Sequence, residues 1–229
     1  MDTENRLIEL LPPGDRRRLL SVAEPSALST GQVLCRPGLA IRQVHFPIDA
    51  CIALMTVIDR HDRVQVGMVG GEGMLGAPLI LGVGVAPWQA VVQGAGSAWR
   101  VGVVPFRREL AASAALRLGV ERYLFVLLGQ LATSAACMRF HEVVPRLARW
   151  MLMAQDRAHA DCFPATHERL AVLLGVRRAS VTLAAGGLQR RGIIEYRRGR
   201  VDVLDRTGLE AAACSCYAAD RERYRERLG

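Results

Sequence analysis

The residues whose types and spacing carry the clearest chemistry are two consecutive arginines, Arg177 and Arg178. They follow a segment in which Thr166 can cap a helix, Gly175 can adopt a left-handed turn conformation and Val176 can fill the angle between two helices. A guanidinium group in the first turn of the second helix can donate two hydrogen bonds to O6 and N7 of guanine in the major groove. The pattern therefore predicts a helix-turn-helix over residues 165–192.

A basic hairpin is predicted directly after this motif. Residues 193–196 and 201–204 are short apolar segments of strand type, and the turn between them, residues 197–200, holds three arginines. We expect Arg178 to contact a guanine, and further contacts to bases or phosphates from Arg177, Ser180 and Thr182. Contacts to phosphates alone are expected from Thr166, His167, Arg197, Arg198 and Arg200. The alternative interpretation is an ordinary helical hairpin with solvated arginines.

The distribution of charge also separates the rear of the chain from the front. All 30 basic residues of the 229 are arginines, and the net charge is +8. Residues 1–105 hold as many acidic residues as arginines, whereas residues 166–229 hold 13 arginines against 8 acidic residues. A basic module of this kind is suited to an anionic partner such as double-stranded DNA. The absence of lysine excludes Schiff-base chemistry and a P-loop lysine.

The front half of the chain predicts a small antiparallel barrel or roll. Short apolar stretches alternate with Gly, Pro and Asp, which is typical of closely spaced strands; they cover residues 43–46, 51–58, 64–69, 90–92 and 99–104. Residues 73–99 lack charge over a length that could span a membrane, but six glycines and two prolines interrupt the stretch. We therefore expect strands and turns there and no membrane contact. The polar start, Met1–Arg6, is unlike a signal peptide, which favours a cytoplasmic protein.

The six cysteines follow no disulfide spacing, so we expect reduced thiols. Cys214 and Cys216 form a C-x-C pair that could bind a soft metal. No further ligand lies near this pair in the sequence, and no metal site is predicted.

One long helix is predicted to connect the two halves. Ser113 can cap a helix over residues 114–139, and a second helix is expected over residues 142–158. Apolar or small residues recur at alternating steps of four and three, which is a heptad pattern; they are Val120, Leu124, Leu127, Leu131, Ser134 and Met138. We interpret this seam as a homodimer interface, with packing on the chain's own roll as the alternative. The predicted domains are residues 1–112, 113–140 and 141–229.

In its order of segments the chain resembles the Crp/Fnr transcription regulators. Gly31–Gly38 is similar to the first roll strands of that family, and Val66–Gly76 is similar to its G-E-x-x-G loop. The resemblance implies an α+β fold: a cyclic-nucleotide-binding-like β-roll of jelly-roll type, a long dimerisation helix and a C-terminal winged helix-turn-helix. It also implies a homodimer on palindromic promoter DNA, contact with RNA polymerase and a signal sensed in the roll.

The sequence departs from the family at the effector site. Relatives that bind cyclic nucleotides hold the ribose with a loop glutamate, here Glu72, and the phosphate with an Arg-Ser or Arg-Thr pair. The second position falls among residues 86–90, and no arginine occurs between Arg63 and Arg100. A buried phosphate without a cation is costly, so cyclic AMP is not expected to bind. The residues left for another effector are Glu72, Gly73, Trp88 and Gln89.

Two further departures concern the other sensors and the operator. Only Cys35 and Cys51 lie in the roll, so a four-cysteine iron–sulfur site cannot form there. Ala179 and Leu183 stand where the family often has an acid and a second arginine, which predicts an unfamiliar operator. We thus expect a DNA-binding regulator with no cofactor and no enzymatic activity. The alternatives are a cupin-type roll enzyme and a ligand-sensing module whose winged helix binds protein.

Overall fold

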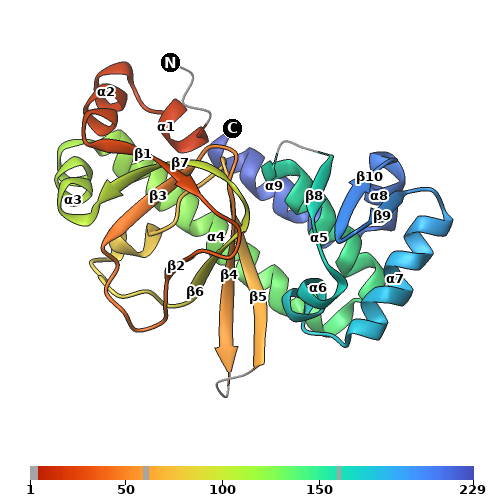
Figure 1. Cartoon of the computed structure of the whole chain (residues 1–229). Coiled ribbons are helices and arrows are strands. Elements are labelled where there is room, and N and C mark those ends of the chain that lie inside the picture. The colour runs from red at the N-terminus through yellow and green to blue at the C-terminus, as the bar shows by residue number, and fades with distance from the viewer. Residues whose placement is uncertain (1–4, 59–61, 159–160) are drawn as a thin grey trace.

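The computed structural model describes residues 5–58, 62–158 and 161–229 (Figure 1). Its helices and strands are, in chain order, α1 (Arg6–Glu9), α2 (Pro13–Ser21), β1 (Ala23–Leu28), β2 (Val33–Cys35), β3 (Gln43–Pro47), β4 (Cys51–Ile58), β5 (Asp62–Val69), the 3₁₀ helix η1 (Ala77–Leu81), β6 (Gln89–Gly94), β7 (Gly96–Gly102), α3 (Val103–Ala112), α4 (Ala114–Phe140), α5 (Val143–Ala158), β8 (Cys162–Pro164), α6 (His167–Leu174), α7 (Arg178–Arg190), β9 (Ile194–Arg197), β10 (Arg200–Val203), α8 (Arg206–Ala212) and α9 (Cys216–Leu228). The predicted order of roll, long helix and winged helix is confirmed.

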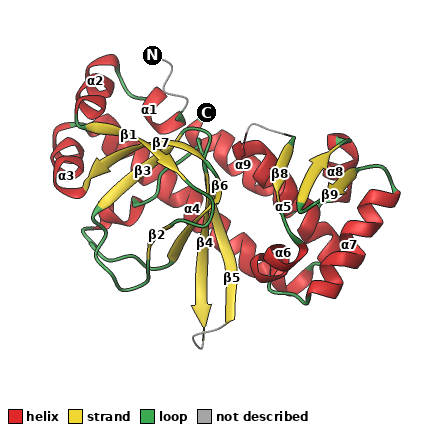
Figure 2. Ribbon diagram, viewed as in Figure 1, coloured by secondary structure: helices red, strands yellow, loops and turns green. Residues whose placement is uncertain are grey.

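The roll consists of two antiparallel sheets, one with the strand order β1-β7-β3 and one with the order β2-β6-β4-β5 (Figure 2). Their inner faces enclose a core in which Phe46 packs edge-on against Phe106 of α3, with 6.1 Å between the ring centroids. The five predicted strands correspond to β3, β4, β5, β6 and β7. The last ends earlier than predicted, at Gly102, because helix α3 begins at Val103.

Residues 73–99 form η1, β6 and the start of β7, as the glycines and prolines predicted. By length and composition, the one membrane-span candidate among the described helices is instead α4. That helix packs on the roll, and 39% of its most apolar window is buried within the chain. Its hydropathy is explained by this packing, since a core helix passes the same test.

Helix α4 begins where Ser113 predicts, with the Ser113 hydroxyl accepting a hydrogen bond from the Leu116 backbone at 3.0 Å. The predicted dimer seam, however, lies mostly inside the chain. Val120, Leu124 and Leu127 belong to the core of the roll, and Leu127 is only 2% exposed. Leu131 and Met138 are half-buried on the same side of the helix.

A different heptad stripe on α4 remains exposed. It consists of Leu118, Phe125, Leu128, Ala132 and Ala135. The sequence pattern did not distinguish the two stripes, because both repeat at heptad spacing and the strands decide which one is covered.

The winged helix is docked against the outer face of the four-stranded sheet. A second hydrophobic core joins Met55 and Met68 of the sheet to Leu147 and Met151 of α5. In the same contact region, the indole nitrogen of Trp150 donates to the Gln65 side chain at 3.1 Å. Helices α3 and α4 end at Ala112 and Phe140, which are the ends of the first two predicted domains. The second hydrophobic core joins residues on both sides of the boundary at Phe140. The division of the chain into three domains at these points therefore remains our proposal.

Helix α9, which the sequence analysis did not predict, lies antiparallel to α4. Cys214 just before α9 meets Cys137, Arg223 lies against Gly129, and Arg227 covers Phe125 at 5.5 Å from the ring centroid. A Cβ on Gly129 would stand 2.5 Å from Arg223, so the glycine permits this close approach. The C-terminal helix thereby connects the winged helix to the long helix of the roll.

Candidate nucleic-acid interface

The two helices of the predicted motif meet at 110°, the angle expected for a helix-turn-helix. Thr166 caps α6 by accepting from the Arg169 backbone at 3.2 Å, and Gly175 ends it with a φ of 62°. The Val176 backbone then donates to the Ala171 carbonyl at 3.0 Å. The Thr166 cap and the left-handed Gly175 are the local roles that the residue types predicted.

Helix α7 presents one open face to solvent. Val181, Ala184, Ala185 and Leu188 are buried against α5 and α6, which leaves Arg178 and Thr182 on the exposed face. Arg177 precedes the helix as its N-cap residue and is also exposed. Ser180 is half-buried at the edge of this face, so its position fits a phosphate better than a base edge.

Leu183 is a residue that the sequence analysis named only as a departure from the family. Its side chain is 76% exposed in the middle of α7, next to Thr182 on the open face. An exposed leucine there can contact the methyl group of thymine. The signal that could have identified it was its position, in the second turn of a helix whose opposite face is apolar.

The basic hairpin forms the expected wing. Strands β9 and β10 are antiparallel partners, with Arg197 opposite Arg200 near the turn and Ile194 opposite Val203 at the other end. Arg198 and Gly199 form the tip with φ angles of 47° and 78°, the left-handed pair of a two-residue hairpin turn. All three wing arginines are exposed, although Arg197 also pairs with Glu195 at 2.6 Å. The tip thus presents exposed arginine side chains beside the N-terminus of α6.

His167 connects the parts of the interface and is half-buried. Its Nδ1 lies 3.0 Å from the Thr182 hydroxyl, and its ring packs edge-on against Tyr196 of β9 at 4.5 Å. Burial and the nearby charge of Arg178 lower the pKa of His167 below its ordinary value. The geometry favours a positioning role for His167 toward Thr182 and the wing over the predicted phosphate contact.

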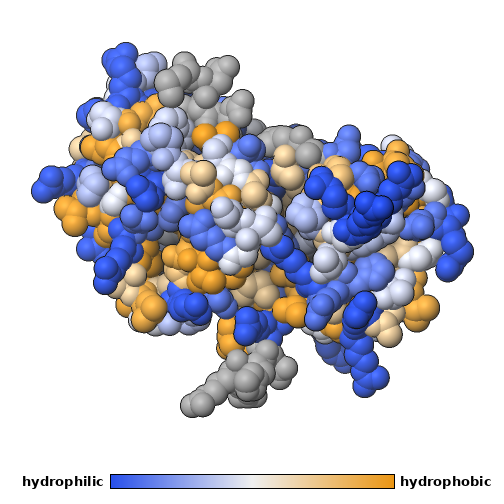
Figure 3. All heavy atoms as spheres, viewed as in Figure 1, coloured by the Kyte–Doolittle hydropathy of each residue, from blue (hydrophilic) through white to orange (hydrophobic). Residues whose placement is uncertain are grey.

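The space-filling view shows groups of hydrophilic side chains, with apolar side chains between them, over the part of the molecule formed by α7 and the wing (Figure 3). A model of the Crp-like helix-turn-helix domain matches residues 145–212, which span α5 to α8. The chain therefore carries a Crp-like helix-turn-helix domain.

Solved structures support this assignment of the fold. FixK2 from Bradyrhizobium japonicum superposes with a TM-score of 0.71 at 12% identity, covering 84% of this chain and 98% of its own. CLP from Xanthomonas campestris, a c-di-GMP-responsive global regulator, gives 0.67 at 17% identity with 84% and 99% covered. A Crp/Fnr-family transcriptional regulator from Thermus thermophilus, TTHA1359, gives 0.67 at 20% with 83% and 98% covered. A comparison with curated protein sequences gives no match.

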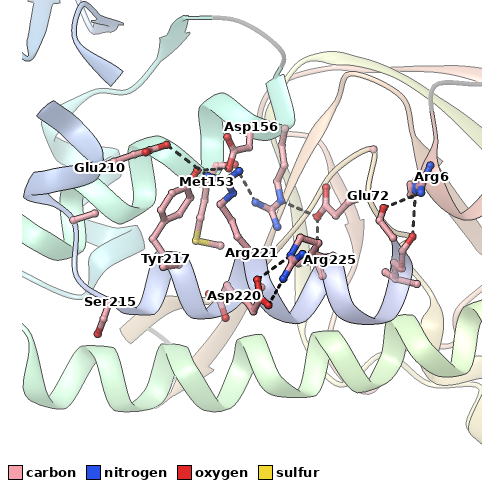
Figure 4. Close-up of a pocket in the computed structure, with 18 of the residues that line it drawn as sticks. Arg6, Glu72, Met153, Asp156, Glu210, Ser215, Tyr217, Asp220, Arg221 and Arg225 are labelled. Atoms are coloured by element: carbon pink, nitrogen blue, oxygen red, sulfur yellow. Dashed lines mark hydrogen bonds and ion pairs between the residues drawn. The ribbon is translucent and has the colours of Figure 1, made fainter. Parts of the chain in front are cut away.

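The four predicted effector residues do not line one cavity. Glu72 lines a cleft of about 1200 Å³ between the roll, α5 and α9 (Figure 4). Trp88 lines a separate cleft of about 430 Å³ together with Cys35 and Arg36, and Gln89 is buried in β6. The four residues therefore do not form a single pocket in this conformation.

Glu72, for which the Crp/Fnr resemblance implied an effector contact, is paired with side chains of its own chain. Its carboxylate accepts from Arg157 of α5 at 2.8 Å and from the Tyr224 hydroxyl of α9 at 3.3 Å. The Tyr123 ring fills the space beside Gly73, where a Cβ would stand 2.1 Å from a ring carbon. The loop thus binds the winged helix and α9 of its own chain.

Proposed function

We propose that the chain is a transcription regulator that binds palindromic DNA as a homodimer and reads each half-site with α7. The observation that carries the proposal is the exposed arginine pair at the start of α7, set at 110° to α6 beside a basic two-residue wing tip. The Crp-like domain and the Crp/Fnr fold support DNA-binding regulation over catalysis. Contact with RNA polymerase and a cytoplasmic location are part of the same proposal.

The proposed dimer uses the exposed stripe of α4 instead of the seam predicted from sequence. Leu118, Phe125 and Leu128 are 46%, 55% and 57% exposed, which is a large apolar surface for one helix. Pairing two copies of α4 along this stripe would bury it and place two α7 helices on one side of the duplex. Half-sites about 34–36 Å apart, one helical turn, are then expected.

A signal felt in the roll would reach α7 through direct contacts. The Arg169 side chain of α6 donates to the Val92 carbonyl of β6 at 3.2 Å, and Gly175 of the turn lies against Val64 of β5. We infer that cyclic AMP is not that signal, because Glu72 is already paired and Tyr123 occupies the adjacent space. Calorimetry giving micromolar affinity for cyclic AMP would contradict this inference.

The experiment that tests the proposed function is selection of bound duplexes from a random pool. We expect a palindromic consensus with half-sites one turn apart, bound more tightly than random DNA by about 10³-fold or more. Binding to random duplexes should fall steeply with salt. A roll enzyme of cupin type would show neither result, and within the described residues the one group of potential metal ligands lies outside the roll.

A further inference from the structure

A cluster of sulfur and nitrogen side chains lies where α4, α5 and α9 meet. Its members, called here the Cys₃His cluster, are Cys137, His141, Cys214 and Cys216. Cys137 and His141 are one helical turn apart at the end of α4, and the other two flank Ser215 at the start of α9. No further ligand lies near the C-x-C pair in the sequence, but the antiparallel packing of α9 on α4 brings Cys137 and His141 to it.

The distances within the cluster match a tetrahedral metal site. The Cys137 and Cys214 sulfurs are 3.6 Å apart, and Cys216 Sγ lies 3.6 Å from His141 Nδ1. All four ligand atoms lie within 4.8 Å of one another. With Zn–S bonds of about 2.3 Å and Zn–N bonds of about 2.0–2.1 Å, a tetrahedral ion has edges of roughly 3.8 Å between sulfurs and roughly 3.6 Å from sulfur to nitrogen.

The surroundings also suit a thiolate-bound cation. The three cysteines are buried, and His141 is half-buried. Three thiolates and one Zn²⁺ carry a net charge of −1, which nearby cations would stabilise. Arg146 and Arg149 supply positive charge here, since both interact electrostatically with Cys137 and Cys214. The Arg149 side chain is held in place by Asp220 at 2.7 Å.

We propose that the Cys₃His cluster binds one Zn²⁺ ion per chain. Ligands of this type and number are those of closed structural zinc sites. His141 caps the C-terminal end of α4, and the C-x-C pair lies at the start of α9, so the ion would fasten the junction of the long helix and the winged helix to the C-terminal helix. Binding the ion would favour the docked arrangement of α9 on α4.

The test uses the full chain, reduced and stripped of metal, and titrated with Co²⁺ and then Zn²⁺. We expect one equivalent of Co²⁺ to give the visible bands of tetrahedral cobalt and a thiolate charge-transfer band, both lost when Zn²⁺ displaces it. Zn²⁺ should raise the thermal unfolding temperature of the chain. Cys214→Ser should weaken Zn²⁺ binding by more than about 100-fold, since even outer-shell changes cost 10–100-fold.

Cys35→Ser is the matched control, because Cys35 is a half-buried thiol of the roll outside the cluster, and it should bind Zn²⁺ as the unmutated chain does. An octahedral cobalt spectrum in the unmutated chain would overturn the proposal whether or not the variants fold. Equal affinity in Cys214→Ser would also overturn it. So would a Cys137–Cys214 disulfide that re-forms in air with zinc present, since the sulfurs would then close to about 2.05 Å instead of binding metal.

Discussion

Glu72 and Arg157 form an ion pair of 2.8 Å that joins the loop after β5 to the last turn of α5. The Arg157 side chain is 7% exposed and that of Glu72 is 23% exposed, so water screens the pair only in part. Although burial alone would lower the pKa of Arg157, the Glu72 carboxylate raises it, and the net shift is upward. The pair therefore connects the winged helix to the roll at a largely buried position, where loss of either partner would leave the other without its counter-charge.

Replacing one partner of this pair should destabilise the fold more than the loss of an exposed pair. Arg157→Met leaves the Glu72 carboxylate partly buried without its cation, which should cost on the order of 3 kcal/mol in the free energy of unfolding. The matched control is Arg197→Met, whose pair with Glu195 is largely exposed and should contribute about 0–1 kcal/mol. Urea unfolding of both variants measures the difference, and similar losses would contradict the proposed role of the pair.

Arg178→Ala should change which sequences are bound. Because Arg178 is exposed in the first turn of α7, its guanidinium group can reach a guanine, and its loss should cost about 1–3 kcal/mol at the best site. Preference should relax at one base pair per half-site. Binding measured on a set of single-base operator variants tests this; an unchanged base preference would contradict the proposed docking of α7.

Arg198→Ala should weaken the binding of all sequences about equally. Arg198 lies in the two-residue turn at the tip of the wing. We expect this turn to stay outside the groove that α7 enters, so that Arg198 contacts phosphate only. The salt dependence of binding should therefore decrease by roughly one counterion per contact, with base preference unchanged. A changed base preference in this variant would contradict the prediction, because it would show that the tip of the wing enters a groove and contacts bases.

Local signals predicted the strands of the roll, the Ser113 cap, and the Thr166 and Gly175 ends of α6, because each depends on a few neighbouring residues. The docked contacts depend on residues far apart in the sequence, and they could not be predicted in this way. Cys137 meets Cys214 only because α9 returns along α4, and Glu72 meets Arg157 only because the winged helix docks on the roll. The sequence analysis placed Leu127 in a dimer interface because a heptad pattern shows that a helix face is buried but does not show which partner buries it. In the structure the roll of the same chain covers Leu127.

The pH dependence of stability should contain a contribution from His45. This side chain is 5% exposed in β3, and burial, with a smaller effect of Arg100, lowers its pKa to about 4. The unfolded chain, with a histidine pKa near 6.5, takes up a proton first. Stability is therefore lost as the pH falls from about 6.5 to 4, by up to roughly 3 kcal/mol.

His45→Gln removes the titrating group and should flatten the stability curve over this range of pH. The carboxylates titrate in both proteins, so the difference between the two curves isolates the histidine. Chemical unfolding at pH 7.5, 6 and 5 provides the measurement. If the free energies of unfolding of the two proteins changed with pH in parallel, the His45 ring would not be buried in its neutral form in the folded chain.

Two neighbouring residues of α4 separate the proposed dimer from the core. Leu128 is 57% exposed on the stripe that we assign to the partner, whereas Leu127 is 2% exposed in the core of the roll. Leu128→Glu should leave the monomer folded, because its side chain is accessible to water there, but should place two carboxylates in the dimer interface. Leu127→Glu should instead destabilise the roll itself, because it buries an unpaired charge.

Sedimentation at micromolar concentration, combined with circular dichroism, distinguishes these outcomes. We expect the unmutated chain to be a dimer, Leu128→Glu a folded monomer with weakened operator binding, and Leu127→Glu a poorly folded chain. Arg108→Glu is a suitable charge control, since Arg108 is an exposed residue of α3 and lies outside α4. A folded dimer of Leu128→Glu would show that the exposed stripe is not the interface. The apolar side chains of Leu118 and Phe125 would then need another partner to cover them.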